Sequence, residues 1–293
     1  MLLEKIIDNI CWLLSKIPLE CMELHFMQMA LLAVLLITPL AATAGVQVVN
    51  FRMAFFADTI GHSAFAGAAL GLILLGSQGP AWSMPLLAML IGLGVMWLKR
   101  SSEIASDTAI GILFAFIVSG GLLLTANSHE LSHLAQSFIF GDVLLIDYQD
   151  IVLLMILFIL HTLFMICNGN RMLLIAIDED LARAHRIQTT WYNYLYISLL
   201  ALIVIVCVKA VGVLLVSALL VVPAAAARNL TTKAGMMVWY ASLCGLLCGI
   251  SGLLLSVHEK VNTASGALIV MLNCIVFAVS ILVKKLRKTA VEG

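Results

Sequence analysis

The chain has 293 residues, of which 63% are hydrophobic and 11% are charged, and its formal net charge at pH 7 is +0. With a mean hydropathy of +1.12, this composition excludes an ordinary soluble domain and indicates a protein that crosses a membrane several times. Zero net charge and dispersed basic residues give no indication of a nucleic-acid partner.

The first 23 residues carry too many charges to span a membrane. Their apolar residues recur at helical spacing, as at Leu2, Ile6 and Ile10, which is typical of a helix lying on the bilayer surface. No signal-peptide cleavage pattern is visible. We therefore expect an amphipathic surface segment at 1–23, a transmembrane domain at 24–288 and a short tail at 289–293.

Nine apolar segments follow, and most reach the roughly 20 residues that cross a 30 Å hydrocarbon core. They are residues 26–49, 54–76, 80–98, 107–125, 151–168, 192–209, 210–227, 234–256 and 264–283. The seventh is short and contains Pro223, so it is expected to lie half-buried among its neighbours. The predicted fold is an all-α polytopic bundle of eight or nine transmembrane helices, and eight would require one segment to be re-entrant.

The distribution of Lys and Arg predicts the orientation in the membrane. Twelve of the 16 gather at alternating segment ends: Arg52, Lys99, Arg100, Arg171, Arg183, Arg186, Arg228, Lys233, Lys284, Lys285, Arg287 and Lys288. By the positive-inside rule these ends are cytoplasmic, which puts the N-terminus outside and the C-terminus inside.

Asp58 and His62 lie four residues apart inside the second apolar segment, and therefore on one face of a helix. An ionisable group at the centre of a membrane helix costs about 2.5–3.5 kcal/mol on insertion scales, and a bound divalent cation would offset that cost. A twofold dimer would bring together two Asp and two His side chains, a ligand set suited to Zn²⁺ and tolerable for Mn²⁺ or Fe²⁺. The alternative is tight helix packing through Gly67 and Gly71, which explains the glycines well and the acid poorly.

The sequence His129-Glu130-Leu131-Ser132-His133 matches the H-E-x-x-H signature of zinc proteases. The predicted topology places it outside, between the fourth and fifth segments, and no recognisable third-ligand motif follows it, although Asp142 and Asp147 are candidates. Three interpretations stay open: an intramembrane metalloprotease, metal collection at the outer mouth by His129 and His133, or ordinary surface residues.

In the predicted cytoplasmic connection between the fifth and sixth segments, the residue pattern predicts a short helix after Asp178. Asp178 is a typical N-cap, acidic residues follow in the first turn, and basic residues near the end complement the helix dipole. The segment is either a capped connector or an element that docks a cytoplasmic partner and transmits force. Its candidate coupling residues are Asp178, Glu179, Asp180, Leu181, Ala182, Arg183, Ala184 and Arg186.

Other polar residues are less specific. His161 is expected to be a satisfied core histidine, and Asp107 to be an N-cap of the fourth membrane helix. The seven cysteines are mostly inside apolar segments and imply no disulfide framework. No Walker lysine loop is present, so the chain is not expected to bind ATP in the usual phosphate cradle.

Six blocks in order resemble the metal-specific family of bacterial ABC importer permeases. They are the RMAFFADTIGHS sequence at 52–63, DTAIGI at 107–112, FGDVL at 140–144, the stretch 178–187, VGVLLVSALLVVPAA at 211–225 and SGALIV at 265–270. The resemblance runs from about residue 28 to 283. It departs from the family at Ala66 and Ala264, where the family usually has proline, and both changes are expected to straighten or stiffen helix ends.

The resemblance implies a type II ABC importer permease that moves Zn, Mn or Fe into the cytoplasm across the bacterial inner membrane. It implies Asp58 and His62 as metal ligands, a second permease copy or paralogue, cytoplasmic ATPase subunits that use the ATP, and an external metal-binding protein that delivers the cation. The permease itself would catalyse no covalent chemistry. A proton-coupled carrier is the alternative within transport, but it needs further intramembrane acids, and only Asp58 sits deep in a segment.

Overall fold

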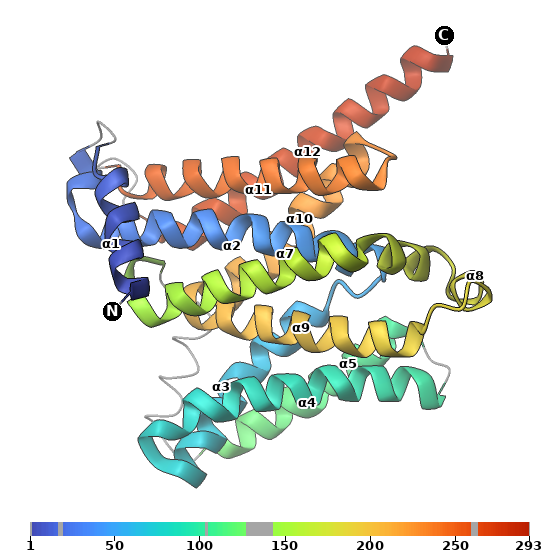
Figure 1. Cartoon of the computed structure of the whole chain (residues 1–293), viewed down its shortest axis with the longest axis horizontal. Helices are drawn as coiled ribbons and strands as arrows, with labels where there is room; N and C mark the ends of the chain where they lie inside the picture. The colour runs from blue at the N-terminus through green and yellow to red at the C-terminus, as the bar shows by residue number, and fades with distance from the viewer. Residues whose placement is uncertain (1, 17–19, 103–104, 127–142, 259–262, 293) are drawn as a thin grey trace.

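The computed structural model describes residues 2–16, 20–102, 105–126, 143–258 and 263–292, and within these ranges the chain is helical and contains no strand (Figure 1). The elements are α1 (Leu2–Leu14), η1 (Glu20–Glu23), α2 (His25–Asn50), α3 (Phe56–Leu75), η2 (Gly76–Gln78), α4 (Gly79–Ser102), α5 (Ser106–Thr125), η3 (Val143–Leu145), α7 (Tyr148–Ile177), α8 (Glu179–Ala184), α9 (Thr189–Val211), α10 (Val213–Leu230), α11 (Ala234–Ser256) and α12 (Ser265–Glu292). In this described part, nine helices are long and apolar enough to cross a membrane, and they match the nine predicted segments in order. The predicted all-α, multi-span fold is confirmed.

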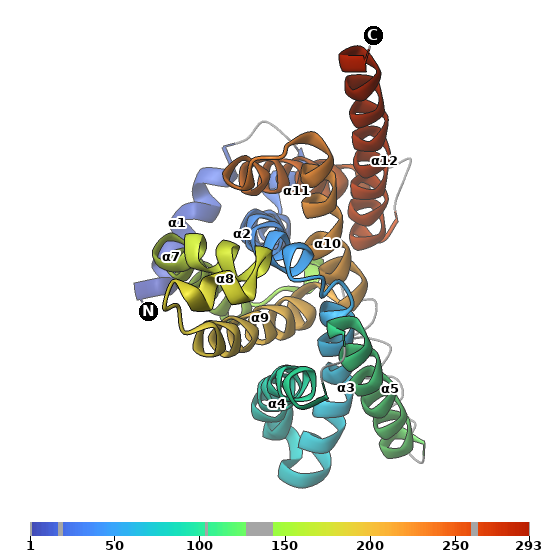
Figure 2. The same ribbon diagram turned by 90° about the vertical axis from the view of Figure 1, so that its right-hand side faces the viewer.

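α2 is the central helix of the bundle, and Figure 2 shows α7, α9, α10 and α11 around it. In its most apolar window 78% of residues are buried, against 17% for α12. A Cβ at Gly45 would overlap the backbone oxygen of Leu220, so the glycine permits α2 and α10 to touch. The buried Tyr196 of α9 donates its hydroxyl to the Ala44 oxygen at 2.9 Å, which ties a third helix to the same point.

α3, α4 and α5 form a second group, with α3 connecting it to α10. In Figure 2 the helices α5, α3, α10 and α12 follow one another along one edge of the molecule. α10 itself is 18 residues long, and half of its apolar window is buried, as predicted for the seventh segment. α9 and α10 are separated only by Gly212, whose φ of 87° is in the region that favours glycine.

A tight reversal connects α2 to α3. Arg52 takes a left-handed backbone conformation with φ of 55°, and the Met53 amide donates to the Val48 oxygen at 3.0 Å. α3 then begins at Phe56, a few residues later than the sequence predicts. Asp58 consequently lies in the first turn of α3 rather than more than a turn inside it.

The opposite end of the bundle, where α2 and α7 begin, is held by polar contacts. The Tyr148 hydroxyl donates to Asp8 Oδ1 at 2.8 Å and contacts His25 Nε2 at 2.9 Å, so it ties α1 to α2 and α7. Lys209 Nζ lies 2.8 Å from Asp150 Oδ1 and joins the end of α9 to the start of α7. These contacts fix how the helices meet at the end away from α8.

Candidate functional site

Asp58 and His62 both point into one cavity at the α3–α5 boundary. The cavity has a volume of about 580 Å³, and its lining includes Phe55, Thr59 and Phe114. Both polar side chains are half-buried, and the His62 ring meets Phe114 edge-on, with ring centroids 5.3 Å apart. The i and i+4 spacing therefore does place the acid and the imidazole on one face, as expected from helical geometry.

Asp107 lines the same cavity, which the sequence analysis did not anticipate. It was expected to be an N-cap, and that expectation is wrong: the N-cap of α5 is Ala105, and Asp107 lies in the first turn. Asp58 occupies the equivalent turn of α3. The N-termini of two helices thus converge beside two carboxylates at this cavity.

The cavity does not contain a complete ligand set for a metal. Among the described residues no group of three or more His, Cys, Asp or Glu side chains is close enough to hold one ion. Asp58, His62 and Asp107 share a cavity but are too dispersed to chelate together. A cation here would need ligands beyond these three side chains or a closer approach of α3 and α5.

The small residues Gly67 and Gly71 lie on the face of α3 that contacts α4. A Cβ at Gly67 would come within 3.0 Å of Met84 Cα, and one at Gly71 within 2.6 Å of the Gly79 carbonyl carbon. The Gly67 and Gly71 stripe therefore packs α3 against α4, as the packing interpretation requires. It leaves Asp58 and His62, which line the cavity next to α5, unexplained by helix packing.

α8 begins as predicted. Asp178 is its N-cap, and its Oδ1 accepts from the amides of Asp180 at 2.9 Å and Leu181 at 3.0 Å. Arg183 Nη2 reaches Glu179 Oε1 at 2.7 Å within the same helix. Ala182 is buried and Glu179 is half-buried, whereas the remaining side chains of the helix are exposed.

Arg186 differs from the expectation because it follows the helix instead of completing its last turn. Its φ of 59° is left-handed, and the Ile187 amide donates back to the Ala182 oxygen at 3.1 Å. This geometry closes the helix end in the way that glycine usually does. The exposed Arg186 side chain therefore projects from a turn rather than from the helix.

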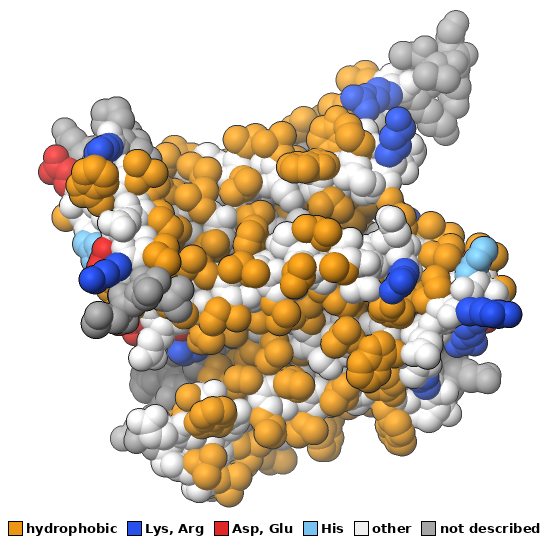
Figure 3. All heavy atoms as spheres, viewed as in Figure 1, with side chains coloured by type: hydrophobic (Ala, Val, Ile, Leu, Met, Phe, Trp, Pro, Cys, Tyr) orange, Lys and Arg blue, Asp and Glu red, His pale blue; other side chains and the backbone are white. Residues whose placement is uncertain are grey.

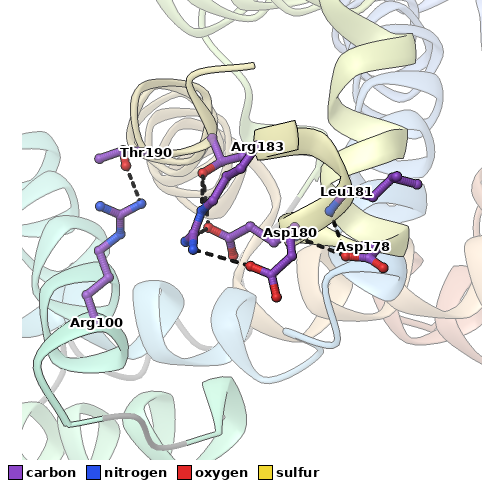
Figure 4. A network of polar contacts seen from close by, with 8 residues as sticks. Arg100, Asp178, Asp180, Leu181, Arg183 and Thr190 are labelled. Atoms are coloured by element: carbon purple, nitrogen blue, oxygen red, sulfur yellow. Dashed lines mark hydrogen bonds and ion pairs between the residues drawn. The ribbon is translucent and has the colours of Figure 1, made fainter. Parts of the chain in front are cut away.

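Neighbouring helices brace α8, as Figure 4 shows. Thr189 at the start of α9 donates its hydroxyl to Glu179 Oε1 at 3.1 Å. Arg100 at the end of α4 donates to Thr190 Oγ1 at 2.6 Å (Figure 4). A displacement of α8 would therefore move α9 directly, and it would move α4 through the hydrogen bond between Arg100 and Thr190.

The proposed zinc-protease signature, with His129, Glu130 and His133, lies outside the described residues, and so does Asp142 of the resembling block at 140–144. His161 lies within them and contradicts its expectation. It is buried at 1% exposure, but neither ring nitrogen has a hydrogen-bond partner in the described part of the chain. Ala66 is a buried residue inside an uninterrupted α3, and α12 begins directly after Ala264.

Comparison with known proteins agrees with this architecture. The chain is 29% identical to the "High-affinity zinc uptake system membrane protein ZnuB" of Haemophilus influenzae over 252 residues, covering 86% of this chain and 95% of that protein. It is 31% identical to the "Manganese import system permease protein ScaB" of Streptococcus gordonii, covering 88% and 91%. Among solved structures, a chain of "PsaBC from Streptococcus pneumoniae in complex with Fab" superposes with a TM-score of 0.75 at 26% identity, covering 94% and 95%.

The sequence model of the ABC 3 transport family matches residues 23–284, which is nearly the whole membrane part of the chain. This match confirms the resemblance inferred from the six motif blocks. The chain belongs to the ABC 3 transport family.

Proposed function

We propose that this chain is the permease subunit of an ATP-driven importer that moves a divalent transition-metal cation, Zn²⁺, Mn²⁺ or Fe²⁺, into the cytoplasm. The observation that carries the proposal is the α3–α5 cavity, where Asp58 and His62 are joined by Asp107. A carboxylate and an imidazole are ligands common to these three metals. The names of the relatives, which include zinc and manganese systems, favour the same cargo class.

Two copies of the chain, or one copy and a paralogue, would complete the site. The described residues of one chain offer too few ligands within reach of one ion, and the edge formed by α5, α3, α10 and α12 carries exposed apolar side chains such as Phe116 and Met271. A twofold axis along this edge would bring a second Asp58 and His62 to the first pair. Asp107 would then serve as the carboxylate through which the cation leaves the site.

The partner subunits would sit at opposite ends of the bundle. We infer that the end carrying α8 faces the cytoplasm, because Lys and Arg concentrate there, so the N-terminus lies outside and the C-terminus inside the bacterial inner membrane. The segment from Asp178 to Arg186 would dock into an ATPase subunit, which binds and hydrolyses ATP, while this chain is not itself an enzyme. An external metal-binding protein would deliver the cation.

The termini and the outer connection complete the proposal. Residues 1–23 would form a surface segment at the outer face, residues 24–288 the transmembrane domain and residues 289–293 a short tail. His129 and His133 would collect cations at the outer mouth. The protease alternative is not favoured, because the relatives are transport proteins, and the proton-coupled carrier is not favoured for the same reason.

The experiment is uptake of radioactive Zn²⁺ and Mn²⁺ into liposomes that contain the chain assembled with a cytoplasmic ATPase subunit and an external metal-binding protein. We expect uptake to require ATP and to fall at least tenfold in Asp58→Asn and His62→Ala. Ser198→Ala is a matched control, since its hydroxyl donates to the Tyr194 oxygen of its own helix and Ser198 does not line the cavity. Uptake that persists in both site variants, or that follows a proton gradient without ATP, would overturn the proposal.

A further inference from the structure

Two cavities that share Arg183 lie where the ends of α4, α8 and α9 come together, in the region drawn in Figure 4. The first, which we call the cationic cavity, has a volume of about 460 Å³ and is lined by Met96, Lys99, Arg100, Glu179 and Arg183. The second, which we call the aromatic cavity, has a volume of about 530 Å³, and its lining includes Ile187, Trp191 and Tyr194. Arg100 Cζ lies 5.6 Å from the centroid of the Tyr194 ring, which brings the two linings together at a second point.

The cationic cavity has an excess of positive charge. Its lining holds three cations and one carboxylate, Glu179, whose Oε1 already lies 2.7 Å from Arg183 Nη2 and accepts from the Thr189 hydroxyl at 3.1 Å. Lys99 is half-buried, and among the described residues it has no carboxylate within ion-pair distance. The C-terminal end of α4 offsets only about half an elementary charge. The lining therefore favours a further anion beside Lys99 and Arg100.

These two cations have donors available for such an anion. Arg100 is exposed, and its Nη2 donates to Thr190 Oγ1 at 2.6 Å, which holds the guanidinium in place (Figure 4). A guanidinium carries five N–H donors and an ammonium three, so Arg100 and Lys99 can both donate to the oxygens of one phosphate. Arg183 is engaged by Glu179 and, at 3.4 Å, by Asp180, and it forms the wall between the two cavities.

The surroundings place these cavities at the level of lipid headgroups. Figure 3 shows apolar side chains over the flank of the bundle and Lys and Arg side chains beside α8 at its end. Lys99 and Arg100 come at the end of the apolar span of α4, Gly79–Ser101. Trp97 of α4 is 65% exposed and Trp191 of α9 is 63% exposed, and exposed tryptophans at the ends of spans are typical of the membrane–water interface. The phosphate of a membrane lipid therefore suits this position better than a soluble anion.

We propose that the two cavities bind one anionic phospholipid, with the headgroup chemistry of phosphatidylglycerol. Its phosphate lies between Lys99 and Arg100, and its glycerol and first acyl carbons lie against Trp191 and Tyr194 of the aromatic cavity. A zwitterionic lipid fits less well, because the net positive charge of the lining repels a headgroup ammonium. The bound lipid joins α4 to α9 beside α8. This assignment requires only the membrane-spanning fold and does not depend on the transported cation.

The test compares phosphatidylglycerol with phosphatidylethanolamine of identical acyl chains. The purified, assembled importer is titrated with each lipid, and bound lipid is counted by native mass spectrometry. We expect the tightest site to prefer phosphatidylglycerol about tenfold, equivalent to about 1.4 kcal/mol, and the preference to shrink as salt is added. Equal binding of the two lipids would overturn the proposal without any variant. Inorganic phosphate is added as a competitor, and displacement of the lipid by it would show that the cavity takes a soluble anion instead.

Three variants locate the preference. Lys99→Gln and Arg100→Gln should each reduce it to about threefold or less. Arg228→Gln is the matched control and should leave it unchanged, because Arg228 is exposed in the last turn of α10 and lines neither cavity. An unchanged preference in both cavity variants, or an equal loss in Arg228→Gln, would contradict the assignment.

The other candidate occupant of the cavities is an acidic surface of the ATPase subunit. If Lys99→Gln weakens binding of that subunit and leaves lipid binding unchanged, the cations contact protein and the lipid assignment is wrong. None of these measurements uses a metal, so their outcome is separable from that of the uptake experiment.

Discussion

The N-cap of α8 gives a prediction that follows directly from its geometry. Asp178 Oδ1 accepts from two backbone amides at 2.9 and 3.0 Å, and an isolated helix of six residues is not stable in water. Replacing an N-cap Asp by Ala costs about 1 kcal/mol, which shifts the equilibrium between ordered and frayed helix about fivefold. Asp178→Ala should therefore raise the hydrogen-exchange rates of the Asp180 and Leu181 amides about fivefold.

A matched variant separates capping from loss of charge. Asp180 is 92% exposed and its carboxylate lies 3.4 Å from Arg183, so Asp180→Ala should cost at most about 0.5 kcal/mol and change exchange by about twofold or less. Asp178→Asn should restore protection because Asn caps as well as Asp. If α8 couples an ATPase to transport, metal-stimulated ATP hydrolysis in the assembled importer should fall in Asp178→Ala and recover in Asp178→Asn.

The result that would refute this reasoning is equal exchange in Asp178→Ala and the unaltered protein, measured by mass spectrometry of peptides covering 178–187. Equal loss of protection in Asp180→Ala would also refute it, because then charge and not the cap would hold the helix.

Three further predictions concern the bundle and the cavity. Gly45→Ala should destabilise the protein by about 3 kcal/mol or more in detergent melting curves, because the added Cβ overlaps the Leu220 oxygen, whereas Gly111→Ala, with open space at its Cβ, should change little. Lys209→Met should lower thermal stability by leaving the Asp150 carboxylate, whose side chain is 12% exposed, without its cation, and adding Asp150→Asn should recover part of the loss. Asp107→Asn should slow maximal metal uptake more than it raises the KM, because we place Asp107 on the exit side of the site; a change in KM alone would contradict that position.

Much of the fold was accessible from the sequence, because hydropathy and length decide which segments cross a membrane. The nine segments and the capped helix at Asp178 depend on local sequence only. The start of α3 was predicted too early because the chain reverses at Arg52 through a left-handed backbone conformation. Non-glycine residues rarely adopt this conformation, so the sequence gives no sign of the turn. For the same reason Arg186 was placed inside a helix that ends before it.

The site was only partly accessible. The spacing of Asp58 and His62 puts them on one face, and the structure brings them to one cavity. Asp107 was missed because its relation to Asp58 depends on how α3 packs against α5, which no local pattern encodes. The unpartnered His161 was missed because a sequence cannot show which buried polar groups lack neighbours. A useful indication was the repeated placement of an acid near the start of an apolar segment, at both Asp58 and Asp107.

The central claim is that the transported cation is bound by Asp58 and His62, and X-ray absorption of Zn²⁺ bound to the assembled importer tests it most directly. The account predicts outer-shell scattering from imidazole in the unaltered protein, its loss in His62→Ala, and one fewer oxygen neighbour per copy in Asp58→Ala. Zinc that keeps an unchanged imidazole signature in His62→Ala would contradict the account, because the metal would then be bound elsewhere.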